Sequence, residues 1–284
     1  MDKRINISAI SHIGNSRDNQ EDNYLVHREG YLPSDVRDEM SNSRTPYCVN
    51  GTAKSNRFMV AVSDGMGGHA CGEVASLLTV EYMSDHYDEI IDSIKLGENS
   101  LATQISLINS VVSSKAKKDS SCRGMGATLC GVIANEFETV GFNVGDSRLY
   151  QFRNGELKQL STDHTEGQRL LRMQLLTEEE VKNFPRRKNL HKYIGYDGEV
   201  IPDIFRITSA EQGTILLLCT DGLSDVMSDK EMEQILNGRA SLKDKATNLV
   251  NEAVSRNLGR GDNTTVVLIE FRKEQSELWL EIQY

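Results

Sequence analysis

The chain has 284 residues, and 32 lysine and arginine residues against 42 aspartate and glutamate residues give a formal net charge of −10 at pH 7. That length suits one large or two small domains, and the charged fraction of 26% is ordinary for a folded protein. The acidic balance argues against broad binding to nucleic acid or to an anionic membrane, because nothing would offset the repulsion from phosphate. It is compatible with a site that holds cations.

Neither a membrane span nor a signal peptide is indicated, because the chain lacks the long apolar runs that both require. The five cysteines are odd in number and none are spaced as C-x-x-C, so the sequence indicates neither a disulfide framework nor a zinc knuckle. Cys219 lies in an apolar run, where a small buried side chain is expected. These features predict a soluble, cytoplasmic protein.

Apolar runs of strand length recur along the chain. Val140, Phe142 and Val144 alternate along one such run, which is the period-two pattern of a strand. Asn154-Gly155 lies between two short runs and is a strong signal for a β-hairpin. The predicted strands are 58–62, 127–133, 139–144, 149–152, 157–160, 214–219 and 264–271.

Helical patterns come in blocks between these strands. The three predicted apolar stripes consist of Val74, Leu77, Leu78 and Tyr82; of Leu101, Ile105, Ile108 and Val112; and of Leu242, Ala246, Leu249, Val250 and Ala253. Gly259 is a plausible stop for the last helix. The block arrangement predicts an α+β fold with a core of paired sheets covered by helices.

Two segments fit this pattern less well. Residues 29–56 are polar and contain Pro33 and Pro46, so a surface insertion or a partly ordered loop is expected. Residues 273–284 mix acidic residues with Leu278, Trp279 and Ile282. They could form an edge strand or a tail that binds a partner.

Aspartates lie at the ends of four predicted buried strands, at Asp64, Asp146, Asp221 and Asp262, and Asp22 lies near the N-terminus. A single such aspartate is usually turn chemistry, but strands of one sandwich can direct several carboxylates to a common point. Carboxylates that close cannot all stay ionised unless cations separate them. Oxygen ligands without a histidine-rich cluster favour Mg²⁺ or Mn²⁺.

The glycine-rich segment 64–69 could be a tight turn between a strand and a helix, since glycine tolerates close backbone approach. In a functional interpretation, Asp64 bridges two metal ions and the carbonyl of Gly65 supplies another oxygen. Arg17 is by itself most simply a solvated surface charge. Beside a metal–carboxylate site, its planar fork could instead hold two phosphate oxygens.

Seven motifs appear in order between about residue 7 and residue 271. They are Gly14-x-x-Arg17-x-x-Gln20-Glu21-Asp22, 64–69 followed by Gly72-Glu73-Val74-Ala75, Gly124-Met125-Gly126-Ala127-Thr128, 144–148, Asp163-His164 with 185–195, 219–225, and 261–265. Together they resemble the PPM (type 2C) family of metal-dependent protein serine/threonine phosphatases, in its bacterial form. The resemblance implies a central antiparallel β-sandwich with helices on both faces, an αββα fold of four layers.

The resemblance also implies a metal centre of two Mn²⁺ or Mg²⁺ ions, with a third possible. Asp64, Asp221 and Asp262 would ligate one ion, and Asp22, Asp64 and the Gly65 carbonyl would ligate the other. Asp146, with Asp221, matches the position of a third, weaker ion, and Arg17 would bind the substrate phosphate. A hydroxide bridging the ions would attack phosphorus in line, so no phosphoenzyme would form.

One departure limits what the resemblance implies about proton transfer. Eukaryotic members have a histidine, the proposed general acid, where this chain has Met66. His69 is close in sequence, and we favour a structural role for it, with a metal-bound water as the acid.

The implied domain organisation is a catalytic domain over 1–271, with an insertion or loop at 29–56, a flap at 163–195 and a tail of unknown role at 272–284. The expected substrates are phosphoserine and phosphothreonine proteins of a serine/threonine kinase system, acted on by a monomer. The alternatives are a catalytically silent module that binds phosphoproteins, and a phosphatase of the same fold that acts on an anti-sigma antagonist. Silent relatives would be expected to lose aspartates, and here all four of Asp22, Asp64, Asp221 and Asp262 are present.

Overall fold

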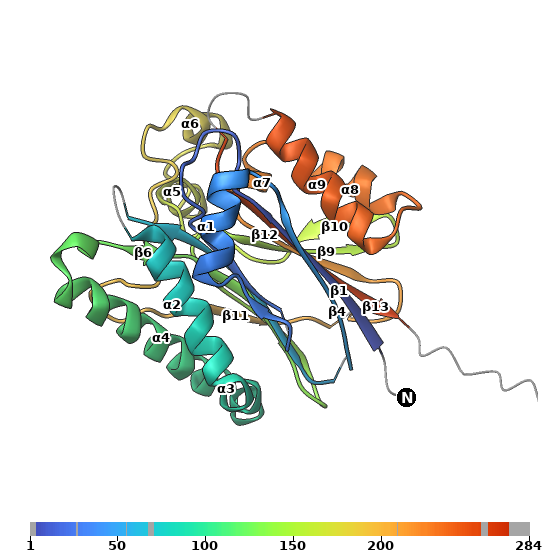
Figure 1. Cartoon of the computed structure of the whole chain (residues 1–284), viewed down its shortest axis with the longest axis horizontal. Coiled ribbons are helices and arrows are strands. Elements are labelled where there is room, and N and C mark those ends of the chain that lie inside the picture. Colours follow the sequence, from blue (N-terminus) through green and yellow to red (C-terminus); the bar gives the residue numbers. More distant parts are fainter. Residues whose placement is uncertain are drawn as a thin grey trace, which may run out of the picture.

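Two antiparallel sheets lie face to face at the centre of the molecule (Figure 1). The computed structural model describes residues 4–26, 28–54, 56–67, 71–208, 210–256 and 261–272. Within these ranges the first sheet has the strand order β10 (Glu156–Gln159), β9 (Arg148–Arg153), β12 (Ile215–Cys219), β13 (Thr264–Arg272), β1 (Arg4–His12), β4 (Tyr47–Lys54). The second has the order β11 (Asp203–Arg206), β8 (Thr139–Val144), β7 (Leu129–Ala134), β5 (Phe58–Met66), β2 (Asp22–Val26), β3 (Gly30–Tyr31), and β6 (Gly126–Ala127) pairs with the end of β5.

Helices cover the outer face of each sheet (Figure 1). The second sheet is covered by α2 (Gly72–Asp85), α3 (Tyr87–Ser93) and α4 (Glu98–Lys118), and the first by α8 (Asp229–Asn237) and α9 (Leu242–Arg256). The remaining helices are α1 (Ser34–Ser43), α5 (Glu166–Arg172), α6 (Glu178–Asn183), α7 (Asp221–Ser224) and the 3-10 turns Ile94–Leu96 and Ser120–Cys122. In the described ranges, the helices are all too short or too polar to cross a bilayer.

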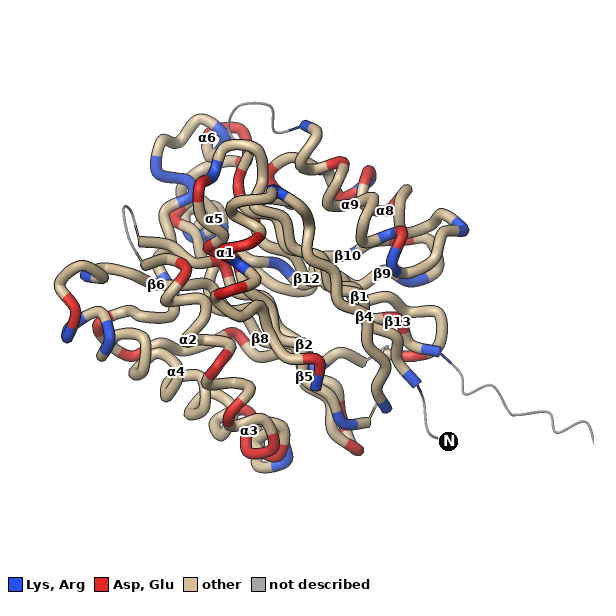
Figure 2. Tube along the Cα trace, in the orientation of Figure 1, with Lys and Arg blue, Asp and Glu red and all other residues tan. Residues whose placement is uncertain are grey.

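The buried apolar side chains form three clusters that separate four layers. One lies between the second sheet and its helices, one between the two sheets, and one between the first sheet and its helices. Strand β13 shows why: Val267 and Ile269 face the other sheet, whereas Val266 and Leu268 face the helices. Figure 2 shows that charged residues gather on the outer helices and loops, away from the middle of the paired strands.

The predicted α+β fold and the αββα arrangement are confirmed, and the seven predicted strand regions all contain strands. The hairpin at Asn154-Gly155 joins β9 to β10, with both residues at positive φ. The strand predicted over 127–133 is interrupted at Thr128 and divides into β6 and β7. The strand predicted to end at residue 62 continues to Met66, so Asp64 lies within β5.

The alternative of a partly ordered loop over 29–56 was wrong, because the segment contains β3, α1 and β4. Strand β4 pairs with β1 along its length and forms an edge of the first sheet, where one side of the strand is exposed and a polar sequence is tolerated. Helix α1 is attached to α2 through Arg37, whose Nη1 donates to the carbonyl of Glu73 at 2.7 Å.

The predicted helix faces have different outcomes. All the predicted core positions of α4 and α9 are buried, as expected. In α2 the fully buried face is formed by Ala75, Thr79 and Met83, whereas the predicted stripe is only partly buried. Helix α2 packs between the second sheet and α4, so more than one of its faces is covered and its periodicity is weak. Gly259 and residues 273–284 lie outside the described residues.

The cysteine prediction needs correction, because Cys71 and Cys122 form a disulfide with Cα atoms 5.3 Å apart. Cys71 precedes α2 and Cys122 ends the 3-10 turn after α4, and the packing of these two helices brings the thiols together. Their separation of 51 residues belongs to no recognisable spacing pattern, which is why the sequence did not indicate the bond. Cys219 is fully buried, as predicted.

Candidate metal centre

The ends of several strands from both sheets meet at one edge of the sandwich. The antiparallel pairing of β2 with β5 places Asp22 directly opposite Asp64. Asp146 follows β8, Asp221 begins α7 after β12, and Asp262 precedes β13. The structure therefore brings together the five aspartates that the sequence singled out.

These residues surround a solvent-open pocket of about 580 Å³. Asp64, Asp146, Asp221 and Asp262 line it, whereas Asp22 lies behind it and is fully buried. The other lining residues are Arg17, Glu21, Gly65, Met66, Gly67, Gly124, Thr128, Lys188, Asn189, Leu190 and Tyr193. The pocket thus combines an acidic floor with a few basic groups at its margin.

Asp22 has an unusual environment for a carboxylate. Its Oδ2 accepts a hydrogen bond of 2.7 Å from Thr220 Oγ1, while its buried Oδ1 has no hydrogen-bond partner among the described residues. Burial raises the pKa of Asp22 to about 7, despite the opposing effect of the Thr220 hydrogen bond. An unsatisfied buried oxygen on a carboxylate of raised pKa is what a missing positive charge would produce.

Asp64 occupies the electrostatic centre of the cluster. Burial raises its pKa well above the usual range, and the carboxylates of Asp22 and Asp221 raise it further. Its backbone N–H donates to Thr128 Oγ1 at 2.9 Å, and its carbonyl accepts from the Thr128 N–H at 2.8 Å. The interruption of the sheet at Thr128 therefore fixes the backbone of Asp64.

The other side of the pocket contains Asp146 and Asp221. Burial and the nearby Asp163 raise the pKa of Asp146 to about 6. Burial also raises the pKa of Asp221 well above its usual range. The negative charges of Asp146 and Asp225 raise it further. These shifts indicate that the carboxylates repel one another across the pocket.

This donor set fits hard divalent cations. Among the described residues, no three carboxylate, histidine or cysteine side chains converge closely enough to enclose a single ion. The carboxylates instead face one another around an open pocket, which suits Mg²⁺ and Mn²⁺ because such ions bind oxygen and retain water ligands. The orphaned Oδ1 of Asp22 and the mutual repulsion of the aspartates are both relieved by positive charge.

Arg17 lies at the rim of the pocket. Its Nη2 donates to Asp262 Oδ2 at 2.8 Å, its Nη1 lies 3.9 Å from Glu21 Oε2, and its side chain is 47% exposed. The hydrogen bond to Asp262 raises the pKa of Arg17 further, so the group is a permanent cation. The structure places this predicted residue beside the predicted carboxylates, with much of its guanidinium accessible.

Gly65 is required by close backbone contact. A Cβ atom at this position would lie 2.0 Å from the carbonyl oxygen of Gly72 and 2.7 Å from that of Glu21. The Gly65 N–H also donates to the Glu21 carbonyl at 3.1 Å. The glycines therefore allow the end of β5, the start of α2 and the N-terminal motif to meet at the pocket, where Gly65 is a lining residue.

Several residues that organise the site were not identified from the sequence. Asn263 joins the N-terminal loop to β13: its Nδ2 donates to the carbonyls of Ile13 and Asn19, and its Oδ1 accepts from the Glu21 N–H. Its position directly after Asp262 in a recognised motif was the available signal. Thr220 was also not identified, although it directly precedes Asp221 in another recognised motif.

The flap supplies further residues of the pocket. Lys188, Asn189 and Tyr193 line the pocket from the segment that follows α6. Met66, which stands where eukaryotic members have the proposed acid histidine, also lines the pocket. His69 lies outside the described residues. The sequence predicted the flap as a segment, but its contacts with the pocket depend on the folded chain.

The comparisons with known proteins agree with this architecture. Residues 47–259 match the family model described as Protein phosphatase 2C. The serine/threonine phosphatase stp of Listeria welshimeri is 37% identical over 219 residues, covering 76% of this chain and 86% of the relative. The comparisons confirm the family and the class of enzyme predicted from the motifs.

Solved structures give the same result. The S. agalactiae serine/threonine phosphatase has a TM-score of 0.77 and 26% identity, covering 94% of this chain and 99% of the other. The catalytic domain of the phosphatase PstP, solved in complex with 2 manganese ions, has a TM-score of 0.68 and 26% identity, covering 95% of this chain and 100% of the other. This chain therefore belongs to the protein phosphatase 2C family.

Proposed function

We propose that this protein is a metal-dependent phosphatase that hydrolyses phosphoserine and phosphothreonine in proteins. The observation that supports it best is a solvent-open pocket that is lined by four aspartates, with Asp22 buried behind it and Arg17 at its rim. Relatives named serine/threonine phosphatases support the substrate class.

The proposed metal ligands are Asp22, Asp64, the Gly65 carbonyl, Asp221 and Asp262 for two Mn²⁺ or Mg²⁺ ions, and Asp146 with Asp221 for a third. The family is metal-dependent, and the manganese complex of PstP supports the choice of ion. When bound, such ions supply hydroxide near neutral pH by lowering the pKa of water. The carboxylates would hold the ions at the strand ends, where the sheets fix the positions of the aspartates.

Arg17 has a separate task in the proposed reaction. Its guanidinium presents a planar fork that can bind two phosphate oxygens. The bond to Asp262 uses only Nη2, so Arg17 is oriented at the rim while its remaining donors can meet the substrate. Holding the phosphate in line with the attacking oxygen contributes to the rate by orientation and by offsetting negative charge.

Proton transfer to the leaving alcohol is not assigned to residue 66, because the methionine side chain has no acidic proton. Burial and the adjacent carboxylates hold the pKa of Asp22 near 7 and that of Asp146 near 6. These values describe the carboxylates before cations bind, and positive charge would lower them. Both side chains therefore serve as anionic ligands in the proposed enzyme.

We propose a catalytic domain over 1–271, with the flap at 163–195 selecting substrates. The flap carries Arg186-Arg187-Lys188, of which Lys188 lines the pocket, and this basic run is a charge pattern suited to acidic phosphopeptides. The proposed setting is a cytoplasmic monomer that opposes a serine/threonine kinase. The complete aspartate set gives no support to a catalytically silent module.

The proposed function is tested by removing metal from the protein and measuring hydrolysis of a phosphothreonine peptide and of para-nitrophenyl phosphate. Adding Mn²⁺ should restore both activities in the wild type, whereas Asp221→Asn should remain folded and nearly inactive. Full activity in the presence of a chelator, or near-normal turnover by Asp221→Asn, would reject the assigned centre.

A further inference from the structure

One basic side chain of the flap reaches the acidic side of the pocket. Lys188 lines the same pocket as Asp146 and Asp221, and its Nζ forms an ion pair with Asp225 Oδ2. Its side chain is 53% exposed and that of Asp225 is 35% exposed, so the pair lies at the mouth of the pocket. Lys188 therefore brings a positive charge to the place where three carboxylates face one another.

The backbone of the flap holds Lys188 at this position. The residues on both sides of it accept hydrogen bonds from the start of α5: Gly167 N–H donates to the Arg187 carbonyl at 3.0 Å, and Glu166 N–H donates to the Asn189 carbonyl at 2.8 Å. The position of Lys188 thus depends on the flap being folded against α5. Conversely, the ion pair with Asp225 attaches the flap to the end of α7.

The electrostatic environment explains why a cation is favoured there. The negative charge of Asp225 contributes to the raised pKa values of both Asp146 and Asp221. The positive charge of Lys188 acts in the opposite direction and lowers the pKa of Asp221. One ammonium group therefore offsets only part of the charge of three neighbouring carboxylates.

We propose that Lys188 is a tethered cation that competes with a third metal ion for the carboxylates of Asp146, Asp221 and Asp225. The inference rests on the proposed metal centre and concerns the regulation of that site. While the third ion is absent, Lys188 neutralises part of this charge and holds the flap against α7. When a divalent ion binds, it replaces the ammonium group, and the flap is released from Asp225.

The strength of the contact is compatible with such an exchange. Partly exposed ion pairs contribute little to stability because solvent screens them, so Lys188 can be displaced without unfolding the flap. A divalent cation carries twice the charge and interacts more strongly with the same carboxylates. Occupancy of the third site and attachment of the flap should therefore be mutually exclusive.

The test is Mn²⁺ binding to the metal-stripped full-length protein, measured by isothermal titration calorimetry. Lys188→Ala removes the internal cation, and we expect its weakest Mn²⁺ dissociation constant to fall roughly 3- to 10-fold. Lys188→Arg keeps the charge and should bind like the wild type.

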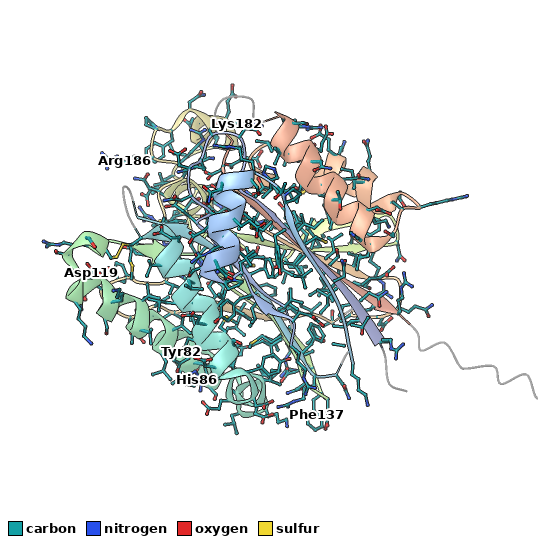
Figure 3. The ribbon with its side chains drawn as sticks, in the orientation of Figure 1. Tyr82, His86, Asp119, Phe137, Lys182 and Arg186 are labelled. Atoms are coloured by element: carbon teal, nitrogen blue, oxygen red, sulfur yellow. A yellow bond between two sulfur atoms is a disulfide. The ribbon has the colours of Figure 1, made fainter. Side chains whose placement is uncertain are left out.

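Arg186→Ala is the matched control, because it removes the same charge from the same segment. Arg186 is exposed at the outer side of the flap (Figure 3) and does not line the pocket. Equal dissociation constants for Lys188→Ala and Arg186→Ala would overturn the proposal, since the effect would then be one of net charge. Tighter binding only in Lys188→Ala would support it.

A second readout reports the position of the flap independently of affinity. In the wild type, hydrogen exchange at residues 186–190 should become faster at Mn²⁺ concentrations that fill the weakest site, and Lys188→Ala should exchange fast without Mn²⁺. Exchange rates unaffected by Mn²⁺ and by the substitution would contradict the coupling. A wild type that binds no Mn²⁺ at all would instead reject the proposed metal centre.

Discussion

The floor and the lid of the pocket are built in different ways. The floor consists of strand ends from both sheets, where buried side chains such as Asn263 and Thr220 hold the backbone in place. The lid is the flap, whose helices α5 and α6 have only Gly167 buried between them and whose charged residues are largely exposed. Under the proposed function, metal binding would depend on rigid elements and substrate recognition on a segment with little buried surface.

The largest effect should come from the centre of the floor. Asp64→Asn removes a carboxylate that interacts with four others, and we expect kcat to fall by about 1,000-fold or more because a metal ligand is lost. The control is Asp119→Asn, which removes an exposed aspartate paired with Lys115 on the surface, seen in Figure 3. Turnover of Asp64→Asn within tenfold of Asp119→Asn would show that the floor is not the catalytic centre.

The free energy of unfolding of the metal-free protein should depend on pH because the aspartates of the pocket are buried close together. The pKa of Asp22 is about 7 in the folded state, well above the usual value for an aspartate side chain. The folded state therefore keeps a proton that the unfolded state loses, and the free energy of unfolding falls as pH rises from about 4 to about 7.

Between pH 5 and pH 7.5, the free energy of unfolding should fall by roughly 2 kcal/mol less in Asp22→Asn than in the wild type. Urea denaturation of the metal-free wild type and variant at both pH values measures this difference. Parallel pH profiles for the two proteins would mean that Asp22 does not carry the raised pKa.

Arg17 at the rim should have a smaller effect. Arg17→Ala should raise KM for a phosphopeptide about tenfold, because the phosphate loses its charged donors, and Arg17→Lys should recover only part of the loss. Arg57→Ala is a matched control, since Arg57 also pairs with aspartates but lies away from the pocket. An unchanged KM in Arg17→Ala would identify Arg17 as a surface charge paired with Asp262.

The smallest effect should come from the lid. Replacing Arg186, Arg187 and Lys188 with alanine should raise KM roughly threefold for an acidic phosphoprotein and leave KM for para-nitrophenyl phosphate unchanged, because exposed charges act mainly on a charged partner. Comparing both substrates at low and high salt separates steering from structural damage. Equal changes for the two substrates would exclude a role in selecting phosphoproteins.

The same contrast explains what the sequence could predict. Four of the aspartates could be identified because they follow or precede strongly apolar strands. Asp22 could be identified from its motif, and the order of the motifs placed all five in one family. The roles of Asn263 and Thr128 could not be predicted, although both lie in recognised motifs, since these roles depend on contacts with Glu21 and Asp64 that only the folded sandwich creates.

Two other features were not visible for related reasons. Strand β4 has a polar sequence because it forms the edge of a sheet, so its pattern resembled that of a loop. The ion pair of Lys188 with Asp225 joins residues from two loops, and no periodicity or spacing relates them.

The central claim is that the five aspartates hold divalent cations at the strand ends. Anomalous diffraction at the manganese absorption edge, from crystals of the Mn²⁺-loaded protein, tests it directly. The account predicts two strong peaks, one beside Asp22 and Asp64 and one beside Asp64, Asp221 and Asp262, and a weaker peak beside Asp146 and Asp221. Peaks elsewhere on the molecule, or an active protein without peaks in this pocket, would contradict it.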